Sequence, residues 1–173
     1  MCIRDSGWVD YCVPQLYWEI GNRAADYKEL IGWWNKSASN RPLYIGEDVL
    51  RTVKYADPQN PNSHQLPAKR KLHQQSPNIS GTVLWYAKAV VDNPGNYGTL
   101  LRTDYWRYPA LQPLMPFIDD KAPSKPKKVK AKWEPDGYYL TWKAPKAKHW
   151  DDEAHRYVCL LYTSDAADDL TRV

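Results

Sequence analysis

The stretch Tyr11-Cys-Val-Pro-Gln-Leu-Tyr-Trp18 is a continuous apolar run that ends in polar and aromatic residues. Such a run is typical of a strand that is buried on both faces of a parallel sheet. The segment after it carries apolar residues at helical spacing, namely Tyr27, Leu30, Ile31 and Trp34. The sequence therefore predicts a strand followed by a helix, and Asn22 is expected to cap that helix.

The same alternation occurs twice more along the chain. Arg41-Pro-Leu-Tyr-Ile-Gly46 predicts a second strand, and a polar loop at 54–63 leads to a helix near 65–75. Gly81-Thr-Val-Leu-Trp-Tyr-Ala87 predicts a third strand, with a last helix near 97–108. Strands and helices in this order are typical of the α/β class with a parallel sheet.

The pattern changes after residue 120. Residues 121–128 contain two prolines and several lysines, which indicates an extended linker. From residue 129 the apolar residues alternate with period two around a turn at Pro135-Asp-Gly137. We expect 129–158 to be a truncated all-β sandwich domain. A lysine-rich stretch with Trp133 can indicate nucleic-acid binding, but a solvated linker and edge strand explain it better, so we expect no nucleic-acid partner.

The two ends of the sequence differ from the rest. Residues 1–6 match a translated transposon end used in sequencing libraries, and 159–169 match the reverse complement of the same adapter. We interpret 1–6 and 159–173 as sequencing-adapter artefacts, so that 7–158 is an internal piece of a longer reading frame. The alternative is a genuine N-terminus and an acidic tail. Without the ends only Cys12 remains of three cysteines, and no disulfide framework is expected.

The aromatic composition is biased, with 9 Trp and 13 Tyr but only 1 Phe. Trp and Tyr offer a flat apolar face with a polar edge, as sugar-binding clefts require, although ordinary core packing explains many of them. No run approaches the roughly 20 apolar residues of a membrane span. His64 and His73 lack metal-ligand spacing, and no Gly-rich phosphate loop is present. We therefore expect no cofactor and no metal.

Three phrases occur in order at the spacing of successive barrel strands: Val13-Pro-Gln-Leu-Tyr-Trp-Glu-Ile-Gly21, Arg41-Pro-Leu-Tyr-Ile-Gly46, and Val83-Leu-Trp-Tyr86 with Val91-Asp-Asn-Pro94. Together they resemble the glycosyl hydrolase-like family 10 proteins, bacterial relatives of (β/α)8 glycosidases, over about 7–118. The resemblance implies that 7–120 is the C-terminal part of a (β/α)8 TIM-like barrel, with strands six to eight. It also implies that strands one to five, with that family's acidic motif, are missing, so the fragment alone is expected to be inactive. Residues 129–158 resemble the start of a fibronectin type III module.

Candidate site residues lie near the predicted C-terminal strand ends, where (β/α)8 enzymes place their active sites. Glu19 is the catalytic candidate, because glycoside hydrolysis needs two carboxylates. The alternative is a surface carboxylate favoured by a helix N-terminus. Trp85 is expected to form the floor under the reacting sugar, by analogy with other barrels. The predicted substrate-binding residues, which core packing or surface exposure would also explain, are Gln15, Tyr17, Trp18, Tyr44, Glu47, Asp48 and Trp85.

These features predict a fragment of a glycoside hydrolase-like protein that hydrolyses glycosidic bonds in a bacterial or dietary polysaccharide by acid/base chemistry. Peptidoglycan glycan strands are one substrate that the family association suggests. The alternatives are a glycan-binding barrel without catalysis and a cell-surface interaction protein. We expect the parent protein to be secreted, periplasmic or on the cell surface.

Overall fold

The computed structural model describes residues 7–39, 41–111, 113–147, 153–154 and 157. The adapter-like ends at 1–6 and 159–173 lie outside the described residues. The chain divides into two compact units, residues 1–115 and 116–173. Each unit is described by itself.

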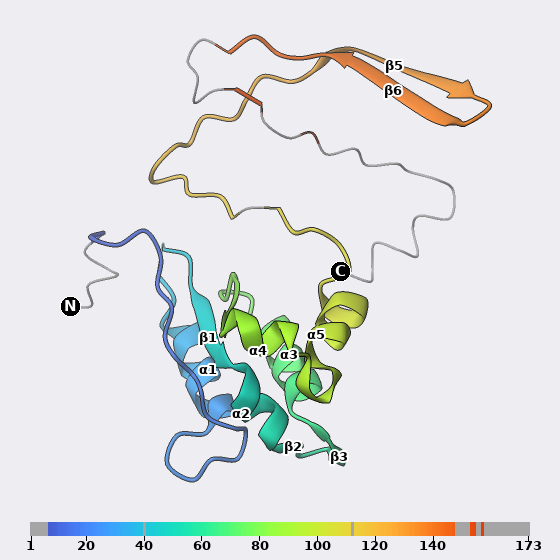
Figure 1. Cartoon of the computed structure of the whole chain (residues 1–173). Coiled ribbons are helices and arrows are strands. Elements are labelled where there is room, and N and C mark those ends of the chain that lie inside the picture. Colours follow the sequence, from blue (N-terminus) through green and yellow to red (C-terminus); the bar gives the residue numbers. More distant parts are fainter. Residues whose placement is uncertain (1–6, 40, 112, 148–152, 155–156, 158–173) are drawn as a thin grey trace. The chain divides into compact units, whose positions relative to one another are not determined.

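The first unit contains a small parallel sheet, one strand of which is labelled β1 in Figure 1. β1 (Tyr44–Asp48) and β4 (Gly81–Trp85) pair in parallel along their whole length. Residues 12–16 also run parallel to β1, with a bridge from Gln15 to Gly46. The three runs predicted to be strands are thus joined by parallel pairing, with β1 between the other two.

Helices follow each of these runs. α1 begins after Asp26, whose carboxylate accepts a hydrogen bond from the main-chain N–H of Lys28. Asn22 was expected at this cap, but its side chain instead accepts from the N–H groups of Ala24 and Ala25 in the preceding turn. The helical elements are α1 (Tyr27–Lys36), α2 (Val49–Lys54), α3 (Leu66–Gln74), α4 (Ala87–Val91), the 3-10 turn η1 (Pro94–Asn96), α5 (Tyr97–Leu100) and the π-turn η2 (Leu101–Tyr105).

Two stretches differ from the sequence-based expectation. The predicted polar loop at 54–63 contains the end of α2 and most of a short antiparallel hairpin, formed by β2 (Ala56–Asp57) and β3 (Asn60–His64). The predicted last helix at 97–108 ends at Tyr105 and changes from α to π geometry on the way. Within the described ranges, no helix is both long enough and apolar enough to cross a membrane.

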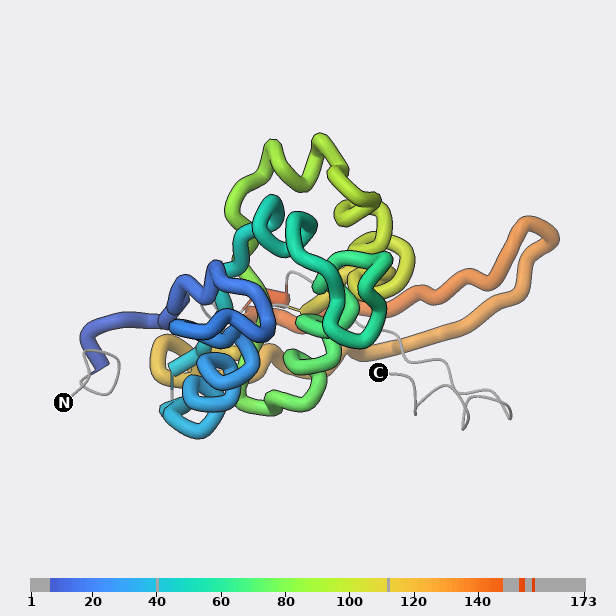
Figure 2. Tube along the Cα trace, turned by 90° about the horizontal axis from the view of Figure 1, so that it is seen from below, coloured from blue at the N-terminus to red at the C-terminus, as the bar shows by residue number. Residues whose placement is uncertain are grey.

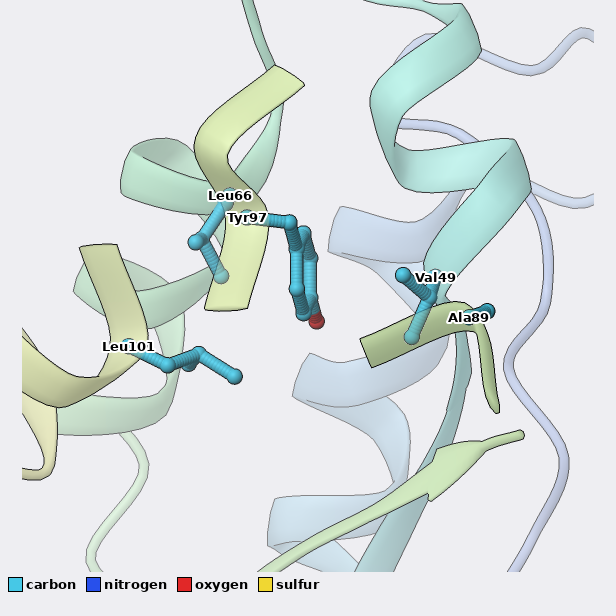
Figure 3. Close-up of a cluster of buried hydrophobic side chains, with 5 residues drawn as sticks. All are labelled: Val49, Leu66, Ala89, Tyr97 and Leu101. Carbon is cyan, nitrogen blue, oxygen red and sulfur yellow. The ribbon is translucent and has the colours of Figure 1, made fainter. Parts of the chain in front are cut away.

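Two apolar clusters hold the helices of this unit in place. The first joins the strands to α1 and consists of Leu16, Tyr27, Ile31 and Ile45. In the second, the ring of Tyr97 lies between Leu66 and Leu101 on one side and Val49 and Ala89 on the other (Figure 3). Helix packing therefore covers the sheet face that carries Ile45. On the other face, Val83 and Trp85 remain 47% and 58% exposed.

The second unit contains an antiparallel hairpin of β5 (Lys127–Glu134) and β6 (Gly137–Lys143) (Figure 2). Trp133 lies opposite Tyr138, so both belong to one face of the hairpin. The turn lies at 135–136, inside the turn predicted at 135–137, and Gly137 begins β6. The wider sandwich domain stays a prediction.

Candidate functional site

A cavity of about 260 Å³ opens on the sheet face that the helices do not cover. Strand alternation explains its lining, because residues two apart point to the same side of a strand. Gln15 and Tyr17 therefore reach the cavity, whereas Leu16 between them is buried in the apolar cluster with α1. The cavity is lined by Tyr11, Val13, Gln15, Tyr17, Gly46, Val83, Leu84 and Trp85.

Gly46 allows the strands to approach closely at the base of this cavity. A Cβ atom at this position would lie 3.2 Å from the main-chain oxygen of Pro14 and 3.4 Å from the Cα of Gln15. Any larger residue would press against the backbone that carries Gln15. The glycine therefore keeps Gln15 and β1 close enough to line one cavity.

Trp85 supplies the aromatic surface of the cavity. It ends β4, lies opposite Asp48 in the parallel register, and is joined to Tyr86 by a cis peptide bond. An exposed indole beside an amide and a phenol can stack on an apolar ring face while the polar groups bind its hydroxyls. Gln15, Tyr17 and Trp85 are the predicted substrate-binding residues that the structure brings together here.

Tyr44 lies on the same sheet face but at the other end of β1. It opens the strand, and its ring packs edge-on against Tyr11 at a centroid distance of 5.8 Å. The prediction that Tyr44 lies at a C-terminal strand end is wrong, because β1 continues to Asp48. Tyr44 supports the cavity through Tyr11, which lines it.

Trp18 and Glu19 lie just beyond the cavity lining. Trp18 is 38% exposed. The carboxylate of Glu19 accepts a hydrogen bond from the amide of Asn22 at 2.7 Å, and its main-chain oxygen accepts from the N–H of Tyr27 at 3.3 Å. Glu19 thus closes the turn that precedes α1. Its catalytic role stays a prediction.

Glu47 faces the helices and not the cavity. Neighbouring residues of a strand point to opposite faces, so Glu47 lies on the side of Ile45 and is fully buried. Its Oε1 accepts a hydrogen bond from the hydroxyl of Tyr27 at 2.5 Å and pairs with the guanidinium of Arg70. His73 Nε2 lies 2.9 Å from the same oxygen. Glu47 and Asp48 were both predicted to bind substrate, but the pleat of β1 places them on opposite faces of the sheet.

The charge of Glu47 is held by its neighbours. Burial raises the pKa of this carboxyl, but the Arg70 guanidinium, the hydrogen bond from His73 and the charge of Lys69 outweigh it. The pKa of Glu47 is therefore well below its usual range, and the group is ionised at neutral pH. Arg70 also donates to Thr82 Oγ1 at 2.7 Å, which links this pair to β4.

Lys69 is a second fully buried cation in the same cluster. Its Nζ donates to Thr52 Oγ1 at 3.0 Å and lies 4.3 Å from the ring centroid of Tyr27. Burial lowers the pKa of Lys69, and the charge of Glu47 opposes that shift. This cluster of Tyr27, Lys69, Arg70 and His73 around Glu47 was not predicted from the sequence. A glutamate in a buried strand, followed by a helix with several cations, was the signal that could have revealed it.

Asp48 lies at the edge of the cavity side. Its Oδ1 accepts a hydrogen bond from the main-chain N–H of Arg51 at 2.9 Å, so it caps α2. Its side chain is 18% exposed, and Oδ2 lies 4.0 Å from Arg51 Nε. Across the part of the chain that the structure describes, no group of three or more His, Cys, Asp or Glu side chains is arranged to hold a metal ion.

Sequence comparison with curated proteins identifies relatives of one kind. The chain is 35% identical over 136 residues to the glycosyl hydrolase YngK of Bacillus subtilis (strain 168). The aligned region covers 78% of the chain and 27% of YngK. It is 31% identical over 91 residues to the glycosyl hydrolase DigH of Escherichia coli (strain K12), covering 47% of the chain and 20% of that protein. The chain is glycosyl hydrolase-like.

The chain spans 27% or less of the length of these two relatives. The match to YngK covers more residues than the 115 of the first unit, so it reaches into the second. No family model matches the chain.

Proposed function

We propose that the first unit is the C-terminal part of a (β/α)8 barrel in a glycoside hydrolase-like protein, and that its open sheet face binds a glycan. In this proposal, residues 12–16, β1 and β4 are strands six to eight. The observation that carries it is the convergence of Gln15, Tyr17 and Trp85 on one cavity, where parallel strands end. The names of the relatives support a carbohydrate substrate.

The proposed binding mode follows from the cavity lining. A sugar ring stacks its C–H face on the Trp85 indole, and burial of an aromatic contact of this size stabilises the complex by roughly 1–3 kcal/mol. The amide of Gln15 can donate to one sugar hydroxyl and accept from another, and the Tyr17 hydroxyl can do the same. In this proposal Gln15, Tyr17 and Trp85 orient the sugar, and carboxylates carry out the cleavage of the glycosidic bond.

The parent protein is proposed to hydrolyse glycosidic bonds of a bacterial or dietary polysaccharide, peptidoglycan glycan strands among them. Hydrolysis requires two carboxyl groups, one as general acid and one as base or nucleophile. Glu47 is buried on the opposite face and Asp48 caps α2, so neither is placed as a free acid in the cavity. Glu19 remains one candidate, and the other acids belong to strands outside this chain.

The second unit is proposed to be the start of a fibronectin type III-like β-sandwich, for which the antiparallel β5–β6 hairpin is the support. The parent protein is proposed to act outside the cytoplasm, as a secreted, periplasmic or cell-surface protein, because polymeric glycans are found there.

A binding function without catalysis is the second candidate. It is favoured by the carboxylates near the cavity, since Glu19 is held by Asn22 and Asp48 by the N-terminus of α2. In this alternative the cavity binds glycans and no bond is cleaved.

One experiment separates the two candidates. The complete reading frame is recovered from source DNA, expressed, and incubated with peptidoglycan strands and neutral polysaccharides. Release of new reducing ends supports hydrolysis. Retention on insoluble glycan without release supports the binding function. A protein that neither binds nor cleaves any of these glycans contradicts both.

A further inference from the structure

We infer that the cavity on the open sheet face is a subsite for an uncharged sugar ring, and that it rejects a ring carrying a carboxylate. This inference rests on the proposed glycan-binding function. Beyond that function, it specifies the class of sugar unit that binds in the cavity.

The lining of the cavity contains only neutral groups. Its hydrogen-bonding side chains are an amide, an indole and phenols, and the remaining residues are apolar or glycine. A carboxylate that enters such a cavity loses hydration, and it regains that energy only where a cation or several N–H donors meet it. Among the described residues that line the cavity, none is Lys, Arg or His.

Three cations of the first unit have partners outside the cavity lining. Arg70 pairs with Glu47 on the covered face, and Lys69 is buried in the same cluster. Lys88, three residues after Trp85, pairs with Asp92 at 2.5 Å on the exposed side of α4. None of these three cations lines the cavity beside Trp85.

The charged group at the cavity's edge is negative. Asp48 lies directly opposite Trp85 in the strand register and on the same face as Gly46, which lines the cavity. Arg51 lies near one Asp48 oxygen, but its side chain is 54% exposed on α2. A carboxylated ring stacked on Trp85 would lie beside the strand position that carries Asp48, and two like charges repel each other.

The same residues favour neutral rings. A pyranose with equatorial hydroxyls presents a flat C–H face to Trp85 and hydroxyl or acetamido groups at its rim. Gln15 matches such groups because its amide has both a donor and an acceptor. The chemical class expected at this subsite is a neutral hexose or N-acetylhexosamine.

The test uses the full-length protein and two matched pairs of oligosaccharides. These are β-1,4-linked hexamers of glucose and of N-acetylglucosamine, each beside its C6-oxidised form, which differs only by its carboxylates. Isothermal titration at low salt gives the affinity ratio within each pair. We expect the neutral member to bind at least tenfold more tightly, and the ratio to fall as salt screens the repulsion.

Variants assign the discrimination to this cavity. Gln15→Lys places a cation in it and should reduce the neutral-to-oxidised ratio several-fold. Lys88→Ala changes the net charge away from the cavity and should leave the ratio unchanged. If the neutral and oxidised members of a pair bind equally tightly and Trp85→Ala weakens the binding of both, this inference is overturned and the proposed function stands. Affinities that do not respond to Trp85→Ala, or no binding of any hexamer, overturn the proposed function together with the inference.

Discussion

The two faces of β1 differ in burial and in what their side chains contact. On the covered face, Ile45 and Glu47 are fully buried, and Glu47 is surrounded by Tyr27, Arg70 and His73. On the open face, Gly46 and Asp48 accompany a cavity whose aromatic and amide groups remain accessible. The polar groups of the covered face are therefore used by the fold, whereas the amide and aromatic groups that line the open-face cavity remain available for a ligand.

Removing the charge on the covered face should have the largest effect on stability. Glu47→Gln leaves Arg70 buried without its counter-charge, and breaking a buried ion pair in this way costs about 3–5 kcal/mol. Urea unfolding of the full-length protein at neutral pH measures this loss. Asp48→Asn is the matched control on the open face, and it should cost under about 1 kcal/mol because Asn also caps helices well. Equal losses for both variants would contradict the contrast between the faces.

The hydroxyl groups of two buried tyrosines on the covered side should contribute differently to stability. Tyr27→Phe removes the hydrogen bond to Glu47 and should cost about 1.5–3 kcal/mol, as expected for a bond to a charged group. The hydroxyl of Tyr97 is buried with no hydrogen-bond partner in the described part of the chain, so Tyr97→Phe should change stability by less than about 0.5 kcal/mol. A larger loss for Tyr97→Phe than for Tyr27→Phe would refute this reading of the cluster.

Removing the aromatic surface of the open face should affect binding and leave folding intact. Trp85→Ala should weaken glycan affinity about tenfold or more, from the loss of roughly 1–3 kcal/mol of stacking. Its unfolding midpoint should move little, since the side chain is 58% exposed. Trp34→Ala is the control, because Trp34 packs on the cluster with α1. It should lower stability without changing affinity, and the reverse pattern would contradict the assignment.

The pH dependence of stability should report on the buried charge of the covered face. The pKa of Glu47 is lowered in the folded protein, so its contribution is fully present above its unfolded value, which is near 4.5, and is lost as pH falls below it. The difference in unfolding free energy between wild type and Glu47→Gln should shrink below that pH, by at most about 1.4 kcal/mol per pH unit. If the stability difference between wild type and Glu47→Gln increased as the pH fell, the predicted direction of this effect would be contradicted.

The sequence predicted the strands well because their apolar runs are long and bounded. Residues 12–16 and β4 fall inside predicted runs, whereas β1 begins inside the predicted run at 41–46 and continues two residues beyond it. The short helices α2 and α4 were missed because 6 and 5 residues are too few for a periodic pattern. The β2–β3 hairpin was read as a loop because its residues are polar.

The site was predictable only where strand alternation applies. Period two placed Gln15 and Tyr17 on one wall, and the parallel order of strands brought Trp85 beside them. The partners of Glu47 are 20 to 26 residues away in sequence, so no local pattern connects them to it. The turn around Glu19 could not be predicted either, because the Asn22 side chain could cap α1 or bind Glu19. Only the fold decides between these two contacts.

The most direct test of the central claim is a crystal structure of the full-length protein with a bound neutral oligosaccharide. The open face is predicted to hold a sugar ring stacked on Trp85, with Gln15 or Tyr17 within hydrogen-bonding distance of its hydroxyl or acetamido groups. A well-ordered glycan bound elsewhere, with Trp85 exposed to solvent or turned into the helix layer, would contradict the claim that this face is the glycan-binding wall.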